Sequence, residues 1–271
     1  MHSWRSFMAI GDSFTEGLDD PAGDGGYRGW ADRLASMMAA DVPDLAYANL
    51  AIRGKMLDDV ITEQVPIATA SKPDLITVCA GGNDIVVPGV NVDAVSQRFD
   101  SMIATLRGTG SDVLVFLGPD TKGLPVMSRL RGKVAVYNAN MRASAEHYGA
   151  MVIDLWAMNV LSDPRAWAAD RLHFSPEGHR RIALRTAELL GVPTTQRWDT
   201  PWPPTSGKPW LAARRADAAW AKEYLIPWIR RQLRGESMGD GMLPKRPELL
   251  PVNNNLDNSF DSAVFNSCPA D

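Results

Sequence analysis

Two short segments of the chain carry side chains that could cleave an ester together. The segment Gly11–Ser13 directly follows the apolar run Phe7–Ile10, and Asp170 stands three residues before His173. A serine at the end of a strand presents a hydroxyl that a nearby base can activate as a nucleophile. An aspartate at this spacing can accept a hydrogen bond from one histidine ring nitrogen, which leaves the other nitrogen to take a proton. The pattern predicts a catalytic triad of Ser13, His173 and Asp170.

Glycine and asparagine residues farther along the chain could stabilise the oxyanion that such a reaction forms. Gly54 follows the apolar run at 45–50, and Asn83 follows the run at 75–80. An oxyanion needs two or three fixed donors, which the backbone N–H groups of Ser13 and Gly54 and the side-chain amide of Asn83 would supply. Taken singly, each segment is better explained as a turn, because glycine permits positive φ and asparagine favours tight loops.

Other interpretations of the same residues remain open at this point. Ser13 taken alone could cap a helix, and Asp170 with His173 could form a surface turn. Asp170 and His173 could also bind a metal together with His179, although a metal site would want more ligands close in sequence. Neither a metal nor an organic cofactor is expected. Ser175 followed by proline predicts a helix start, which places His173 on a loop just ahead of a helix.

Short apolar runs alternate with longer amphipathic segments up to about residue 192. The runs are typical of strands buried on both faces of a parallel sheet, and they are Phe7–Ile10, Leu45–Leu50, Leu75–Ala80, Val113–Leu117 and Met151–Leu155. Helices are expected near residues 28–40, 56–70, 92–107, 131–148 and 176–190. This alternation predicts a three-layer α/β/α fold with a five-stranded parallel sheet. Its strands should end at one edge and bring the predicted site residues together.

The composition changes after Pro193, so we predict a catalytic domain over 1–193 and an extension beyond it. Residues 194–209 are rich in Pro, Thr and Trp, and residues 210–234 form a plausible amphipathic helix with an aromatic stripe at Trp220, Tyr224 and Trp228. We expect 194–234 to pack on the domain, and a membrane-surface helix is the less favoured alternative. Residues 235–271, rich in Gly, Pro, Asn and Asp, are expected to form a flexible tail.

Composition excludes several classes of protein. The net charge is −4 over 271 residues, which argues against a general nucleic-acid binder. Two cysteines, Cys79 and Cys268, do not make a disulfide framework. The N-terminus lacks a signal-peptide pattern, and no apolar run approaches the roughly 18 residues needed to span a bilayer. A cytoplasmic protein is expected, and the sequence indicates no oligomeric state.

The motifs taken together resemble those of the SGNH hydrolases, the GDSL-type esterases and lipases. These proteins carry GDS after the first strand, a glycine after the second, GGND after the third and DxxH before the last helix, in the order seen here from about residue 6 to residue 190. The resemblance implies a flavodoxin-like fold. It also implies that Ser13 is the nucleophile, that Gly54 and Asn83 form the oxyanion hole, and that Asp170 orients His173. Phe14 stands where the GDSL name has leucine, which should affect packing only.

The expected activity is that of a serine esterase that hydrolyses or transfers the acyl groups of small or medium acyl esters through an acyl-enzyme. A lysophospholipase or thioesterase acting on lipids is one alternative. A non-catalytic ligand-binding protein on the same scaffold is another, because fold does not imply function. A conventional α/β-hydrolase would need a G-x-S-x-G elbow, and the sequence contains none.

Overall fold

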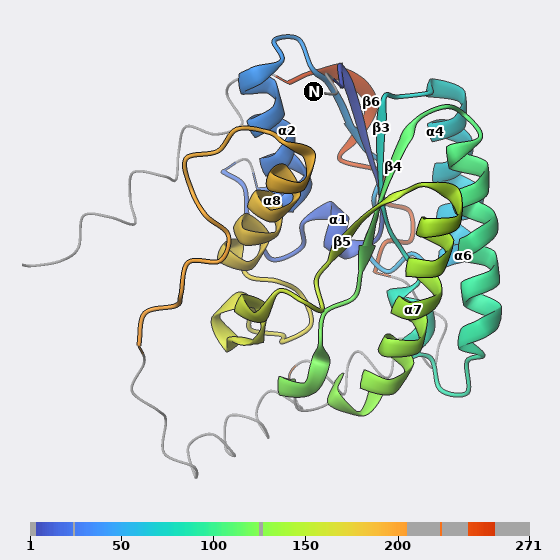
Figure 1. The fold of residues 1–271 in the computed structure, drawn as a ribbon, viewed down its shortest axis with the longest axis vertical. Coiled ribbons are helices and arrows are strands. Elements are labelled where there is room, and N and C mark those ends of the chain that lie inside the picture. Colours follow the sequence, from blue (N-terminus) through green and yellow to red (C-terminus); the bar gives the residue numbers. More distant parts are fainter. Residues whose placement is uncertain (1–3, 24, 125–126, 205–222, 224–237, 253–271) are drawn as a thin grey trace, which may run out of the picture.

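The computed structural model describes residues 4–23, 25–124, 127–204, 223 and 238–252, which form a central sheet between two layers of helices (Figure 1). Five strands run parallel, as β1 (Ser6–Gly11), β2 (Ala46–Asn49), β3 (Leu75–Cys79), β4 (Asp112–Leu117) and β5 (Met151–Asp154). Each lies within one residue of its predicted bounds. Their side chains are mostly buried because helices cover both faces of the sheet.

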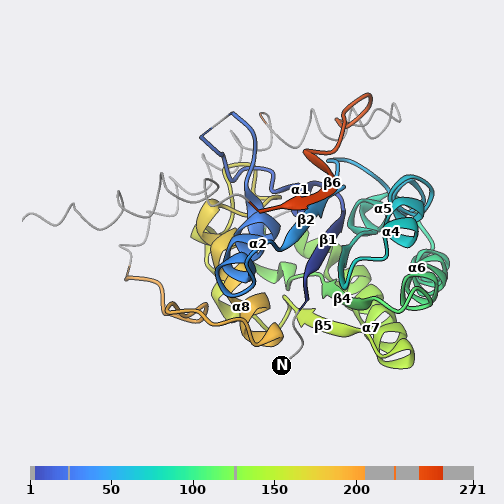
Figure 2. The same ribbon diagram turned by 90° about the horizontal axis from the view of Figure 1, so that it is seen from above.

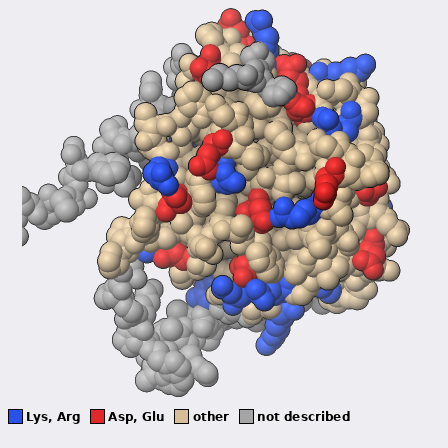
Figure 3. All heavy atoms as spheres, in the orientation of Figure 1, with Lys and Arg blue, Asp and Glu red and all other residues tan. Residues whose placement is uncertain are grey.

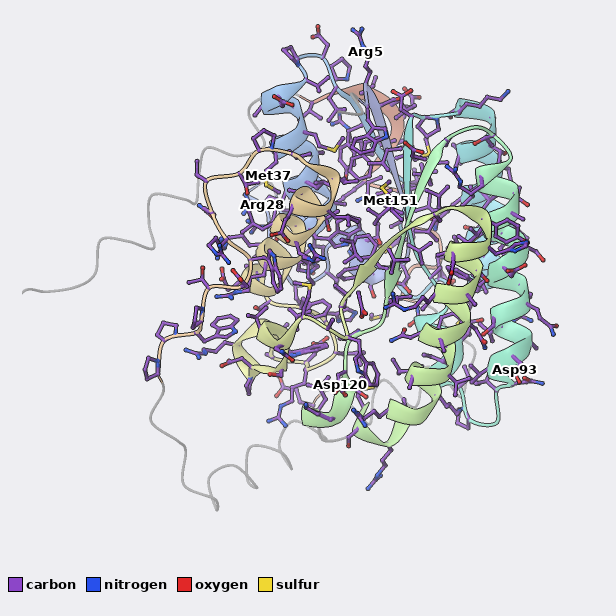
Figure 4. All side chains as sticks on the ribbon, in the orientation of Figure 1. Arg5, Arg28, Met37, Asp93, Asp120 and Met151 are labelled. Atoms are coloured by element: carbon purple, nitrogen blue, oxygen red, sulfur yellow. The ribbon has the colours of Figure 1, made fainter. Side chains whose placement is uncertain are left out.

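One layer of helices covers one face of the sheet and a second layer covers the other (Figures 1 and 2). The first layer contains α2 (Gly29–Asp41) and α8 (Pro176–Leu190), which pack against each other. The second contains α4 (Val65–Ser71), α6 (Val92–Arg107) and α7 (Arg131–Tyr148). Figure 4 shows side chains filling the space between the sheet and both layers. The three-layer α/β/α fold predicted from the sequence is confirmed.

The helix predicted at 56–70 is divided into three parts. It consists of α3 (Leu57–Asp59), a π-helical turn η1 (Val60–Gln64) and α4. Pro66 is the second residue of α4, just after the turn; it has no N–H to donate, and its ring would crowd the carbonyl four residues earlier. A widened turn relieves that conflict, and such turns occur often at functional sites.

The order of the strands places a crevice at the carboxyl edge of the sheet. The order is β5-β4-β3-β1-β2-β6, so the chain leaves β1 toward β2 on one side and places β3 on the other. Ligands of open α/β sheets bind outside the strand ends at such a reversal. Two short helices begin there, α1 (Ser13–Glu16) after β1 and α5 (Gly82–Val86) after β3.

A sixth strand, β6 (Arg246–Pro251), pairs antiparallel with β2 at the edge of the sheet. This strand departs from the five-stranded sheet predicted above and lies inside the segment 235–271 that was expected to be flexible. Its sequence, RPELLP, carries two prolines, which only an edge strand accommodates. The pairing depends on β2, which lies about 200 residues earlier in the chain, so no local sequence pattern predicts it.

Residues 194–204, the first part of the extension predicted over 194–234, contact the domain through two tryptophans. The indole nitrogen of Trp202 donates to the Val160 carbonyl at 2.8 Å, and the Arg181 guanidinium lies 4.2 Å from the centre of the Trp202 ring. Trp198 donates to Glu188 of α8. The aromatic stripe predicted at Trp220, Tyr224 and Trp228 lies outside the described residues, so its packing stays a prediction.

Charged side chains of both signs are interspersed on the face of the molecule shown in Figure 3. Within the described part of the chain, none of the helices has the length and apolar character needed to cross a membrane.

Candidate active site

The structure brings the three residues of the predicted triad into one hydrogen-bonded chain. Nε2 of His173 lies 2.9 Å from Oγ of Ser13, and Nδ1 of His173 lies 2.6 Å from a carboxylate oxygen of Asp170. The Ser13 side chain is buried, and those of His173 and Asp170 are only 11% and 18% exposed. The distances allow proton transfer from the serine to the histidine.

Local structure explains the orientation of the histidine. The second carboxylate oxygen of Asp170 accepts from the backbone N–H groups of Leu172 and His173 at 2.9 and 3.0 Å, so the turn itself fixes the aspartate. Ser175 caps α8 by accepting from the N–H of Gly178, which confirms the predicted helix start. In the neutral ring Nδ1 donates to Asp170, so the lone pair of Nε2 faces Ser13.

The turn that carries the nucleophile is held by groups from two other elements. Gly11 has φ 148°, and a Cβ there would lie 2.2 Å from the Cys79 carbonyl oxygen, so the position requires glycine. The side-chain amide of Gln64 accepts from the N–H of Gly11 at 2.8 Å and donates to its carbonyl at 2.9 Å. The sequence analysis missed Gln64, because a glutamine on an amphipathic helix carries no signal of such a role.

The two predicted oxyanion donors belong to segments that touch each other, the helix α5 and the loop after β2. Asn83, in α5, donates through its side-chain amide to the carbonyl of Lys55 at 2.9 Å. Gly54 directly precedes Lys55, and its φ of 76° favours glycine. Arg53, which precedes Gly54, forms an ion pair with Glu16 of α1. The backbone N–H of Arg53 also donates to the Glu16 carboxylate at 2.7 Å. This pair ties the glycine loop to the helix that begins with the nucleophile.

Burial and neighbouring charges shift the titration of the site. Burial disfavours the charged ring of His173, but the carboxylates of Asp170 and Asp19 outweigh it and raise the pKa of His173 to about 9. Burial likewise works against the charged form of Asp170, and its hydrogen bond to His173 lowers the pKa below its usual value. Burial raises the pKa of Asp12, the cap of α1, to about 6. Asp19 was not among the predicted site residues.

The structure brings together Asp170 and His173 but not His179, the third metal ligand that the sequence left open. His179 is fully buried, where its Nδ1 accepts from the N–H of Trp30 and its Nε2 donates to the Leu18 carbonyl, both at 3.2 Å. In the part of the chain that the structure describes, one trio of acidic and histidine groups is close enough to share a cation, namely Asp19, Asp170 and His173. There the Nδ1 atom of the histidine is already engaged by Asp170, which fits a triad better than a metal centre.

A cavity of about 190 Å³ opens beside the triad. Ser13, Asn83 and His173 lie on its wall, and most of the remaining wall is apolar, with Ile85, Val86, Leu124, Val134, Leu155 and Trp167. Phe14 also lines it and stacks on Trp30, in line with the packing role expected for this position. A larger groove of about 280 Å³ between α2, α8 and residues 193–196 contains none of the triad residues.

Comparison with known proteins gives one family and several related folds. The model of the GDSL-like lipase/acylhydrolase family matches residues 9–181, a span that includes the whole triad. None of the curated proteins compared with the chain matches it.

Solved structures share the fold at low sequence identity. The acetylxylan esterase Axe2 of Geobacillus stearothermophilus is 19% identical with a TM-score of 0.56, over 71% of this chain and 95% of that one. The esterase EstA of Pseudoalteromonas sp. is 14% identical with a TM-score of 0.54, over 69% and 97%. TesA is 20% identical with a TM-score of 0.57, over 68% and 97%. At these identities the likeness concerns the fold alone.

Proposed function

The chain belongs to the GDSL-like lipase/acylhydrolase family, and from that premise we propose that it is a serine hydrolase that cleaves esters of small or medium acyl groups. One observation carries the proposal. The hydrogen-bonded chain from Ser13 through His173 to Asp170 opens onto an apolar cavity. A nucleophile, its base and a place for an acyl chain therefore lie together.

The geometry supports an acyl-enzyme mechanism. His173 takes the proton of Ser13 through Nε2 as the serine oxygen attacks the ester carbonyl, and Asp170 stabilises the imidazolium that forms. The amide of Asn83 and the N–H groups of Gly54 and Ser13 donate to the oxyanion. His173 then gives its proton to the leaving alcohol. Water attacks the acyl-enzyme in the second half, again with His173 as base, and releases the acid and the free serine.

The lining of the cavity supports an acyl group longer than acetyl. Most of its side chains are hydrocarbon, and they line a space that extends from Ser13 toward α7. Each methylene buried there contributes up to about 0.8 kcal/mol, or roughly fourfold in kcat/KM. Acetyl esters, the substrate class in the name of the Axe2 relative, are the second candidate.

A series of p-nitrophenyl esters from acetyl to decanoyl, assayed on the purified chain, tests the proposal. We expect kcat/KM to rise from acetyl through the medium acyl groups. Val86→Phe should fill part of the cavity and lower kcat/KM for the longer esters more than for acetyl, whereas Val136→Phe, at an exposed position of α7, should change neither. A best rate with acetyl in both variants and wild type would contradict the medium-chain assignment. Lysophospholipids and acyl thioesters added to the series test the lipid alternative.

The metal alternative has its own test. Hydrolysis should continue in EDTA, because the mechanism above uses only side chains and backbone N–H groups. Full loss of activity in EDTA, restored by zinc, would favour a metal at Asp170 and His173.

A further inference from the structure

A second carboxylate lies beside the histidine of the triad. Asp19, in the loop after α1, places a carboxylate oxygen 3.6 Å from Nδ1 of His173, the same nitrogen that Asp170 holds at 2.6 Å. The mechanism proposed above does not use Asp19. Its side chain is about one third exposed, whereas that of Asp170 is half as exposed.

The backbone conformation and the anchoring of the loop fix the position of Asp19. Its backbone adopts φ 67°, a left-handed conformation that aspartate and asparagine tolerate better than other non-glycine residues. The next residue, Asp20, is buried and pairs with Arg33 at 2.9 Å, and it also accepts from the N–H of Gly29. This anchoring holds the loop, and with it the Asp19 carboxylate, against the histidine.

We propose that Asp19 is a second positioning carboxylate of the active site, which stabilises the imidazolium form of His173 through space while Asp170 holds the ring by its hydrogen bond. Nδ1 carries one hydrogen, and Asp170 accepts it. At 3.6 Å Asp19 is beyond hydrogen-bond range and therefore acts by its charge. The proposal rests on the function proposed above, because it assigns Asp19 a part in the same reaction.

The other groups that face His173 do not change charge while the ring titrates. Ser13 and Asp12 face it from the start of α1, and His179 approaches it from α8. Burial raises the pKa of Asp12 only to about 6 and lowers the pKa of His179 to about 4. Between neutral pH and pH 9, Asp12 therefore stays ionised and His179 stays neutral.

The sign of the expected effect follows from the role of the base. Hydrolysis needs neutral His173, so activity rises as the pH increases through the pKa of the ring, which lies near 9. Without Asp19 the imidazolium is less stable, and the rise should move to lower pH by about one unit. The alkaline plateau should fall at the same time, because the imidazolium of the transition state loses the same support.

The test compares Asp19→Asn with Asp44→Asn. Both aspartates have φ 67°, and Asp44 is exposed in the turn before β2, so the two substitutions match in chemistry, charge and backbone conformation. Two quantities are measured, the acid limb of kcat/KM against pH and the pKa of the His173 ring by NMR, in a chain with only four histidines. Asp19→Ser serves as a second neutral variant.

We expect Asp19→Asn and Asp19→Ser to lower the His173 pKa, and the pH at the midpoint of the rise in kcat/KM, by about one pH unit. Asp44→Asn should lower neither. A His173 pKa that stays at its wild-type value in both Asp19 variants would overturn the proposal, even where kcat falls. A wild-type chain that hydrolyses no ester would count against the proposed function, whereas the NMR titration would still decide the effect of Asp19 on the ring.

Discussion

The Nε2 nitrogen of His173 lies 2.9 Å from the Oγ of Ser13, and 160 residues of chain separate the two. The loop ahead of α8 and the turn after β1 meet at the carboxyl edge of the sheet. Each side of the contact is fixed independently, because Asp170 orients the ring and Gln64 holds the strand end beside the serine. The serine and its base are thus aligned before any substrate binds.

Ser13→Ala should abolish ester hydrolysis and leave the fold intact. In a well-studied serine protease the loss of the nucleophile alone costs about 10⁶ in kcat. Removing one oxygen at a turn held by its backbone should change thermal stability little. Hydrolysis rates, thermal unfolding and labelling by a fluorophosphonate probe check this. Labelling that persists in Ser13→Ala would place the nucleophile elsewhere, and a wild-type chain that takes no label would favour the non-catalytic alternative.

Asn83→Ala should lower kcat by about 10²–10³ with little change in KM, because an oxyanion donor acts in the transition state more than in the ground state. Steady-state kinetics on the preferred ester measure both constants. Asn159→Ala, at an exposed position of the 3-10 helix η4 (Asn159–Ser162), is the control and should leave both unchanged. An effect confined to KM would instead make Asn83 a substrate-binding residue.

The buried His179 should make the protein sensitive to acid. Burial lowers the pKa of His179 from 6.5 to about 4, so the unfolded chain takes up a proton that the folded chain refuses. The free energy of unfolding is unaffected by this ring above pH 6.5, where both states hold it neutral. It decreases as the pH falls from 6.5 toward 4, by about 3 kcal/mol in all, because the unfolded chain alone binds the proton. His179→Gln should flatten the free energy of unfolding against pH in this window, as measured by urea titrations. His147→Gln, on the exposed side of α7, is the control; equal slopes in both variants would refute the assignment.

Lys245→Met should destabilise the fold. The Lys245 ammonium, just before β6, lies 2.6–3.0 Å from four acceptors that share its three hydrogens, the carbonyls of Glu16, Tyr27 and Arg28 and the Asp32 carboxylate. Burial raises the pKa of Asp32, and Lys245 opposes that shift. Removing one partner of such a pair typically costs about 3–5 kcal/mol when the pair is fully buried, and less here because Lys245 is partly exposed.

Denaturant unfolding of Lys245→Met and of Lys122→Met, whose side chain is mostly exposed, measures the difference. Equal stability of the two variants would show that the segment before β6 only rests on the domain. A lower stability of Lys245→Met alone would make residues 238–252 part of the folded unit.

The amino-acid sequence by itself determined the parallel strands and the long helices, and it predicted the three residues that the structure brings into one hydrogen-bonded chain. The strands can be recognised in the sequence because they are buried on both faces, which requires continuous apolar runs such as Leu75–Cys79. The candidate site residues can be predicted because each follows the end of a strand or precedes a helix. The rules of α/β topology bring these chain positions to one edge of the sheet.

Only the tertiary structure decided which side chains support the triad. Asp19 reaches His173, Gln64 reaches Gly11 and β6 reaches β2 across long stretches of chain, and each contact depends on how loops and layers pack. Local patterns do not encode such contacts, because hydrophobic periodicity reports the burial of a segment but not its partner. A partly buried aspartate, a helical glutamine and a strand with two prolines therefore look ordinary until the fold places them beside the site or the sheet.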